Sequence, residues 1–280
     1  MVMLTFIGMF TNQYIPMWMK DNESNHMNNV VGQLSNLKSG IDMQVLNNNQ
    51  QVASAPIYSP IALHAEGVPV FSSPTMGTLT FTSEKDVGGA YIVISFDYIS
   101  GGTTYTLDST NGGKTGGSLE FYGANRYFIQ QNVTYENGGI ILNQTDGEAM
   151  LSGISIRLVA SGGELSMKIT LTSLTGVSKT VAGFGTKSIT STLEYTTYQK
   201  MENRPVGSDV TLRIVTKYPF AWKQYYESLF EKTGVPGTVT DPAVDPGNPD
   251  YRSITVTIPD VNVLEYTKAV ATITIADIGV

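Results

Sequence analysis

The first 46 residues carry a hydrophobic pattern that predicts a long helix. No charged residue occurs from Met1 to Met19, and the first charge is Lys20. As an α-helix this run would extend about 28 Å at 1.5 Å per residue, close to the apolar thickness of a bilayer. Pro16 has no backbone N–H, so we expect a kink near it. The alternative for this segment is a buried core helix of a soluble domain.

Further along, the pattern changes to an amphipathic stripe. Apolar residues recur at spacings of three and four, the period of a helix with one apolar face: Met27, Val30, Leu34, Leu37, Ile41 and Val45. A run of Asn and Gln from Asn47 to Gln51 ends the stripe. The stripe has to pack on the chain's own β structure or on neighbouring copies of the helix. The predicted helical domain spans residues 1–50, and a helix this long is typical of coiled-coil, transmembrane or assembly roles.

Residues 51–204 are predicted to form a β-rich head. Prolines restrict its first part, residues 52–76, and none occurs between Thr75 and Arg204. Apolar and polar residues then alternate as in half-buried strands, for example over residues 127–135 and 165–171. The sequence of residues 136–139, Glu-Asn-Gly-Gly, predicts a hairpin turn. Many short strands with glycine turns predict an antiparallel β-sandwich with a jelly-roll-like arrangement.

Residues 205–280 have a different pattern, which predicts a C-terminal strand-helix-strand-strand lobe. A strand ends near Thr216, and Pro219 takes the favoured first position of a helix. Gly234 then stops that helix. Its aromatic face, Trp222 to Phe230, is expected to be core. The fold class is therefore α+β and mainly β, with three parts at 1–50, 51–204 and 205–280.

Composition narrows the function classes. Charged residues make up 15% of the chain and the net charge is −7, which argues against a nucleic-acid partner. There are no cysteines, so disulfides and thiolate chemistry are excluded. The low charge and the abundance of Thr, Ser, Asn, Gly and Tyr are common on secreted β-proteins.

No catalytic, metal-binding or cofactor-binding residues emerge from the sequence. The only two histidines, His26 and His64, cannot be placed in a catalytic triad or a two-histidine metal site. The acidic loop of residues 241–250 could offer oxygen ligands to Ca²⁺ but lacks the EF-hand pattern, so a solvated loop is the simpler interpretation. We therefore expect a protein that is not an enzyme and has no cofactor.

Three Asn-x-Ser/Thr sequences are candidate N-glycosylation sites: Asn22, Asn132 and Asn143. Asn132 and Asn143 are the better candidates, because they lie on either side of the predicted hairpin turn. Modification depends on export in a host that N-glycosylates its proteins.

Two segments carry a resemblance to a known group of proteins. Ser118–Leu151 and Lys217–Glu227, together with the apolar N-terminus, are similar to archaeal type IV pilin-like surface proteins that have no characterised function. The chain departs from many pilins in having Thr5 where they carry Glu, and in having Pro16 inside the apolar run. The resemblance implies export, removal of a basic leader by a prepilin-type peptidase, and anchoring or polymerisation through the N-terminal helix.

The sequence thus predicts a pilin-like structural subunit of an extracellular filament. It would sit in the membrane before assembly, form a helical homo-oligomer and expose its head, with surface glycans as possible partners. The alternatives are a membrane-anchored monomeric adhesin or carbohydrate-binding protein, and a secreted enzyme with an unrecognised site. The residues expected to carry assembly are apolar side chains of the helix: Leu4, Phe6, Ile7, Phe10, Ile15, Trp18, Val30, Leu34, Leu37 and Ile41.

Overall fold

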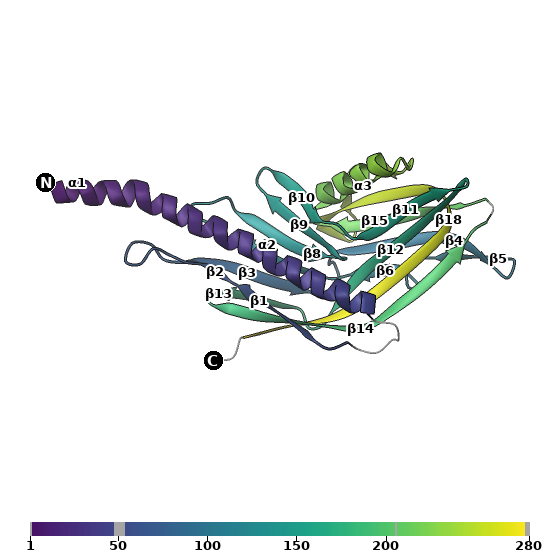
Figure 1. Ribbon diagram of the computed structural model, residues 1–280, viewed down its shortest axis with the longest axis horizontal. Coiled ribbons are helices and arrows are strands. Elements are labelled where there is room, and N and C mark those ends of the chain that lie inside the picture. The colour runs from purple at the N-terminus through teal and green to yellow at the C-terminus, as the bar shows by residue number, and fades with distance from the viewer. Residues whose placement is uncertain (1, 48–53, 205, 278–280) are drawn as a thin grey trace.

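A computed structural model describes residues 2–47, 54–204 and 206–277, so both predicted domain boundaries lie at residues outside the described ranges. The chain begins with one long helical rod, made of α1 (Val2–Met9), the π-helical turn η1 (Phe10–Tyr14) and α2 (Ile15–Asn47). The first part of the rod projects beyond the sheets, and the second part lies along them (Figure 1). The predicted Asn/Gln run after Asn47 also lies outside the described residues.

The rod departs from α geometry immediately before Pro16. A proline in a helix removes a hydrogen bond to the residue four positions earlier, and its ring clashes with that carbonyl. Here that carbonyl belongs to Asn12, inside η1, and the N–H of Ile15 donates to the oxygen of Phe10, five residues back. The hydroxyl of Thr11 also donates to the carbonyls of Ile7 and Gly8. The wider π turn thus accommodates the proline without ending the helix.

The larger sheet has 11 strands, and its central path runs β1-β14-β18-β15-β4-β5. Its members are β1 (Ile57–Ala62), β4 (Tyr91–Ser100), β5 (Thr103–Leu107), β6 (Lys114–Gly116), β11 (Ser155–Ser161), β12 (Glu164–Thr175), β14 (Thr186–Glu202), β15 (Ser208–Thr216), β16 (Thr238–Val239), β17 (Ala243–Asp245) and β18 (Asn248–Asp277). Every pair is antiparallel except that of β12 and β18, which run parallel.

The smaller sheet has seven strands in the order β10-β9-β8-β7-β3-β13, with β2 on the edge of β3. Its members are β2 (His64–Ala65), β3 (Thr75–Thr82), β7 (Ser118–Gly123), β8 (Gln131–Glu136), β9 (Gly139–Gln144), β10 (Gly147–Ser152) and β13 (Lys179–Gly183). Strands β7 to β10 follow one another as an antiparallel meander. Asn137, at φ 53, and Gly138 form the predicted hairpin turn between β8 and β9.

The two strands predicted at the C-terminus are one strand, β18, of 30 residues. It bends at Asp260, which has a left-handed φ of 55. Before the bend it pairs with β15, and after it with β14 and β12. Because β15 and β18 lie inside the larger sheet, residues after 205 share a sheet with the rest of the head. The prediction of a mainly β chain with antiparallel sheets and a long N-terminal helix is confirmed, whereas the jelly-roll arrangement stays a prediction.

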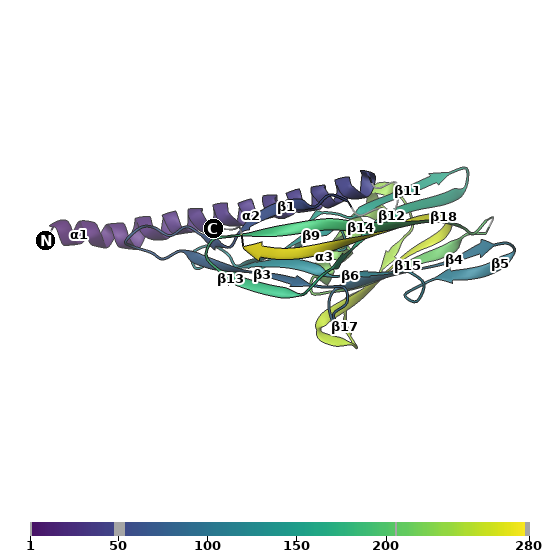
Figure 2. The ribbon, with the colours of Figure 1, turned by 90° about the horizontal axis from the view of Figure 1, so that it is seen from below.

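Two large hydrophobic cores and a small third cluster, around Val215 and Tyr251, lie in the head. In one, the apolar stripe of α2 packs against both sheets, including Ile61 of β1 and Phe121 of β7. In the other, α3 (Pro219–Thr233) lies against β10, β15, β16 and β18, and residues of β4, β9 and β12 complete the core. Ile140 belongs to the first core and its neighbour Ile141 to the second, so β9 separates the two. Seen from below, α2 runs along one side of the head (Figure 2).

Candidate functional site

The structure divides the predicted assembly residues into two groups. Val30, Leu34, Leu37 and Ile41 are fully buried on the chain's own head, which settles the question of what this part of the stripe packs on. The remaining residues belong to what we call the stem, residues 2–18. Within it, Ile15 is also buried, whereas Ile7 is 45% exposed and Trp18 43% exposed. The side chains of Leu4 and Phe6 lie outside the described part of the structure.

The stem carries more apolar surface than sequence reasoning assigned to it. Ile7, Tyr14 and Trp18 are 43–45% exposed, and three methionines are more than half exposed: Met3, Met9 and Met17. Exposed apolar residues are normal when scattered, but a contiguous group marks an interaction surface. This group lies on a rod that projects past both sheets (Figure 1).

An aromatic cluster joins the stem to the head. The ring of Phe10 lies 5.4 Å from that of Trp18 and 5.3 Å from that of Phe71, in the loop between β2 and β3. Tyr14 completes the cluster, 6.1 Å from Phe10. Val70, beside Phe71, is fully exposed at a φ of 71, which is strained for a β-branched residue. The loop therefore braces the base of the stem.

Glu23 anchors α2 where the stem meets the head. Its side chain is fully buried, yet it is a carboxylate on the apolar side of the helix. It accepts hydrogen bonds from the hydroxyl of Thr75 at 2.6 Å and from the backbone N–H groups of Arg126, Tyr127 and Phe128 at 3.0, 2.7 and 2.7 Å. Bonds of this kind to a charged acceptor are stronger than neutral ones. Glu23 thus ties the helix to β3 and to the loop before β8.

Polar contacts with β1 and its flanks extend this attachment. The Nε2 atom of His26 donates to the carbonyl of Ala62 at 2.9 Å, and the N–H of Ala62 donates to Gln33 at 3.3 Å. Gln44 donates to the carbonyl of Ala55 at 2.7 Å. Burial lowers the pKa of His26, because the charged form loses its hydration. His64 lies close enough to lower it further, so the fold brings the chain's two histidines together.

The two preferred sequons are direct neighbours. Asn132 of β8 is paired in register with Asn143 of β9, and both side chains are half-buried. Directly opposed residues of this kind have Cβ atoms about 5 Å apart. Asn22 is elsewhere, on α2, where its amide donates to the carbonyl of Glu66 at 3.0 Å.

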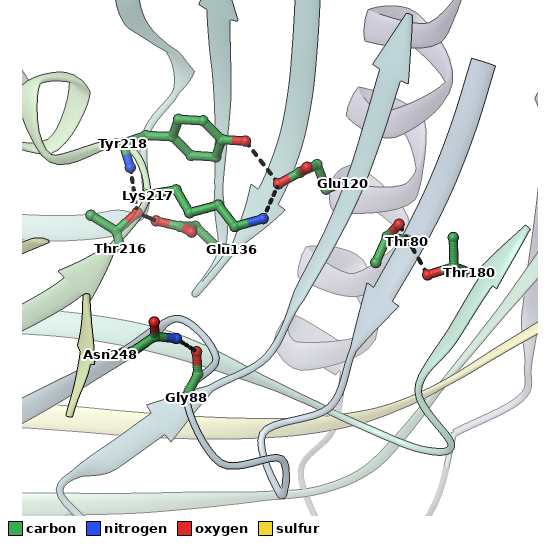
Figure 3. Close-up of polar contacts among 9 residues, drawn as sticks. All are labelled: Thr80, Gly88, Glu120, Glu136, Thr180, Thr216, Lys217, Tyr218 and Asn248. Atoms are coloured by element: carbon green, nitrogen blue, oxygen red, sulfur yellow. Dashed lines mark hydrogen bonds and ion pairs between the residues drawn. The ribbon is translucent and has the colours of Figure 1, made fainter. Parts of the chain in front are cut away.

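A second buried carboxylate holds α3 against the smaller sheet. Glu136, at the end of β8, is almost completely buried and accepts from the hydroxyl of Thr216 at 2.7 Å and from the indole N–H of Trp222 at 2.5 Å. Burial raises the pKa of Glu136 to about 7, and the two donors oppose this shift. Figure 3 shows Glu136 beside Thr216, next to Glu120.

Two further glutamates contact the residues at and just before the start of α3. Glu120 of β7 accepts from the hydroxyl of Tyr218 at 2.8 Å and pairs with Lys217 at 3.3 Å (Figure 3). Glu148 of β10 accepts from the backbone N–H groups of Phe220 and Ala221, which are free donors in the first turn of α3. The two segments that carried the resemblance are therefore in contact. Ser118–Leu151 supplies the carboxylates, and Lys217–Glu227 supplies the start of α3.

Sequence reasoning missed all four glutamates. For Glu23 a signal existed, because it lies four residues from both Met19 and Met27 and so falls on the apolar stripe. The glutamates of the sheet gave no comparable signal. In the predicted acidic loop, Asp245 pairs with Arg213 at 2.6 Å and Asp241 with Lys223 at 2.5 Å.

A metal centre and a membrane-spanning helix are both absent from the part of the chain that the structure describes. Across residues 2–47, 54–204 and 206–277, no group of three or more His, Asp or Glu side chains is arranged to hold a metal ion. Among the helices described, none combines the length and the apolar character needed to cross a bilayer. Comparison of the chain with family models, with curated proteins and with solved structures gives no match.

Proposed function

We propose that this chain is a pilin-like structural subunit of an extracellular filament that resembles archaeal type IV pili. Copies would associate through their stems, and the β heads would face outward. The observation that carries the proposal is the projecting stem, which is charge-free through Met19 and exposes apolar side chains beyond the end of its own head.

The energetics favour covering this surface. Complete burial of a large apolar side chain contributes about 1.5–3 kcal/mol, so burying the exposed half of Ile7 or Trp18 would contribute roughly 1 kcal/mol. Several such residues on each copy, with no charge to desolvate, make helix-to-helix packing favourable. The stripe from Val30 to Ile41 takes no part, because the head already covers it.

The attachment of α2 to the head supports the same proposal. A subunit that assembles through its helix has to hold the head in a fixed position relative to that helix. Glu23, the contacts of His26 and Gln44, and the Phe71 brace provide such an attachment.

The test compares two variants that carry the same new charge. Ile7→Asp places a carboxylate on the exposed side of the stem, and Thr103→Asp places one on the exposed strand β5 at the far end of the head. We expect electron microscopy of material sheared from producing cells to show filaments for the parent chain and for Thr103→Asp, and none for Ile7→Asp. Mass spectrometry identifies the filament protein.

Thermal unfolding of the Ile7→Asp head should match the parent, because Ile7 lies on the projecting stem and is not among the residues that form the two large cores. Intact filaments from Ile7→Asp would refute the assembly role of the stem. Parent protein found only in membranes, without filaments, would refute the subunit function and favour a monomeric membrane-anchored surface protein.

A further inference from the structure

A cleft of about 580 Å³ lies where the turn between β9 and β10 meets the start of α3. This volume is in the range of small-molecule binding sites, roughly 300–1,000 Å³. Figure 1 shows the β9–β10 hairpin next to α3. The residues that matter for recognition are Asn143, Gln144, Asp146, Glu148, Phe220 and Gln224.

One side of the cleft is an exposed aromatic ring. Phe220 is 54% exposed, although it belongs to a helix whose other aromatic residues are packed into the core. Its backbone is fixed, because its N–H donates to Glu148 at 2.8 Å and the next N–H donates to the same oxygen at 3.1 Å. With the backbone held, only the two side-chain torsions of the ring have to be ordered on binding, so the ring offers a flat apolar surface at a low entropic cost.

Carboxamides line the cleft on both sides, with Asn143 and Gln144 at the end of β9 and Gln224 one turn after Phe220 on α3. Asn143, Gln144 and Gln224 each combine a carbonyl acceptor with an NH₂ donor, which matches hydroxyl groups that both donate and accept. The amide of Gln144 is oriented, since its oxygen accepts from Gln131 at 3.0 Å and its NH₂ group remains available. Asp146 adds an exposed carboxylate at the rim.

The charge of the lining narrows the ligand class. Neither Lys nor Arg is among the residues that line the cleft, and two carboxylates are. An anionic ligand such as a phosphate, a sulfate or an acidic sugar would meet like charge there without a compensating cation. A neutral ligand with an apolar face and several hydroxyl groups fits best.

We propose that this cleft binds a neutral saccharide unit, with one C–H face of a pyranose ring stacked on Phe220 and its hydroxyl groups bonded to Asn143, Gln144 and Gln224. A volume of about 580 Å³ limits the part of the ligand that the cleft holds to one or two sugar units. The proposal concerns the head alone and does not depend on assembly through the stem, so the Ile7→Asp variant binds the sugar as the parent does.

The first experiment applies the full chain, produced in a host without N-glycosylation, to an array of neutral, sialylated and sulfated oligosaccharides. The best neutral ligand is then titrated by calorimetry against the parent, Phe220→Ala, Gln224→Ala and Phe184→Ala. Phe184 is the matched control, because it is 58% exposed and does not line this cleft. Unchanged melting temperatures show that the variants are folded.

We expect binding to neutral sugars only, at least tenfold weaker for Phe220→Ala, several-fold weaker for Gln224→Ala and unchanged for Phe184→Ala. Absence of binding to every neutral sugar, binding to acidic sugars alone, or full affinity in Phe220→Ala would overturn the proposal. So would a glycan covalently attached to Asn143 in the native protein, because that glycan would fill the cleft.

Discussion

The buried carboxylate of Glu23 gives the sharpest test of how the helix is held on the head. Four donors converge on it: the Thr75 hydroxyl and three successive backbone N–H groups of residues 126–128. Two of these donors bond one carboxylate oxygen and two bond the other. Glu23→Gln keeps the size of the side chain and replaces one oxygen by an NH₂ group. The best orientation turns this NH₂ group towards Thr75 and Arg126, where the Thr75 hydroxyl can accept from it but the N–H of Arg126 loses its acceptor.

The magnitude follows from the backbone bond that is lost and from the loss of charge on the acceptor of the remaining bonds. A buried donor left without an acceptor costs about 1–3 kcal/mol, and bonds to a charged acceptor lie at the upper end. Partial relaxation of the loop recovers some of this, so we expect Glu23→Gln to lower the free energy of unfolding by about 3 kcal/mol. At roughly 2–4 °C per kcal/mol for a chain of this size, the melting temperature falls by about 6–12 °C.

Thermal unfolding followed by circular dichroism at pH 7 measures the effect. Asp21→Asn is the matched control, since it removes a carboxylate from an exposed position two residues earlier on the same helix and should stay within about 0.5 kcal/mol of the parent. Amide hydrogen exchange at residues 126–128 should also accelerate in Glu23→Gln. A melting temperature within about 2 °C of the parent, with unchanged exchange, would show that these bonds do not secure the helix.

Three further predictions test other parts of the structure. The pKa of Glu136 is raised from its ordinary value of 4.5 to about 7, so between these pH values the folded protein holds a proton that the unfolded chain has released, and its stability falls as the pH rises towards 7. Urea unfolding of Glu136→Gln should lack that loss, which reaches about 1.4 kcal/mol per pH unit in the parent. The pKa of His26 is lowered, so the contribution of this residue to the free energy of unfolding is present above pH 6.5 and is lost as the pH falls. His26→Gln, whose amide can still donate to the carbonyl of Ala62, should therefore lose less stability than the parent between pH 7 and pH 5. Gly153→Ala should lower the free energy of unfolding by about 1–3 kcal/mol in chemical denaturation, because an added Cβ overlaps the Tyr225 ring. Gly162→Ala is the comparison, since the space around Gly162 is open and the change tests only its left-handed φ.

Local patterns were sufficient for much of the fold. The spacing from Met27 to Ile41 predicted which side of α2 would be buried, and period-two alternation predicted β12 over residues 165–171. The helix α3 begins at Pro219 and ends before Gly234 as expected, with Gly234 in the left-handed conformation. These features depend on a few adjacent residues, so a single sequence contains the information.

The predicted strand over residues 127–135 shows where local reasoning fails. The alternation is present, yet β8 begins only at Gln131. The backbone N–H groups of Tyr127 and Phe128, which a strand would use for pairing, donate instead to Glu23. A contact across 104 residues of sequence therefore overrides the local preference, and no pattern within the segment indicates it.

The candidate sites divide in the same way. The exposed part of the stem could be predicted, because it follows from a charge-free run and a change of pattern after Met19. The glutamates that grip α3 could not, since Glu136 meets Trp222 across 86 residues. The pairing of β12 with β18 was equally hidden, because alternation identifies a strand but not its partner.

The π turn at Phe10–Tyr14 also sets a rotational phase. An α-helix turns by about 100° per residue, so a turn that accommodates one additional residue shifts the azimuth of everything on its N-terminal side by about that angle. Met3 and Ile7 lie on that side, whereas Glu23 and the buried stripe lie on the other. Deleting one residue between Phe10 and Tyr14 would keep the contacts of Glu23, His26 and Gln44 with the head, turn Phe10 away from Phe71, and point the tip of the rod in a different direction around its axis. In an assembly built on this rod, the five residues of the π turn, Phe10–Tyr14, would therefore set the angle between neighbouring heads.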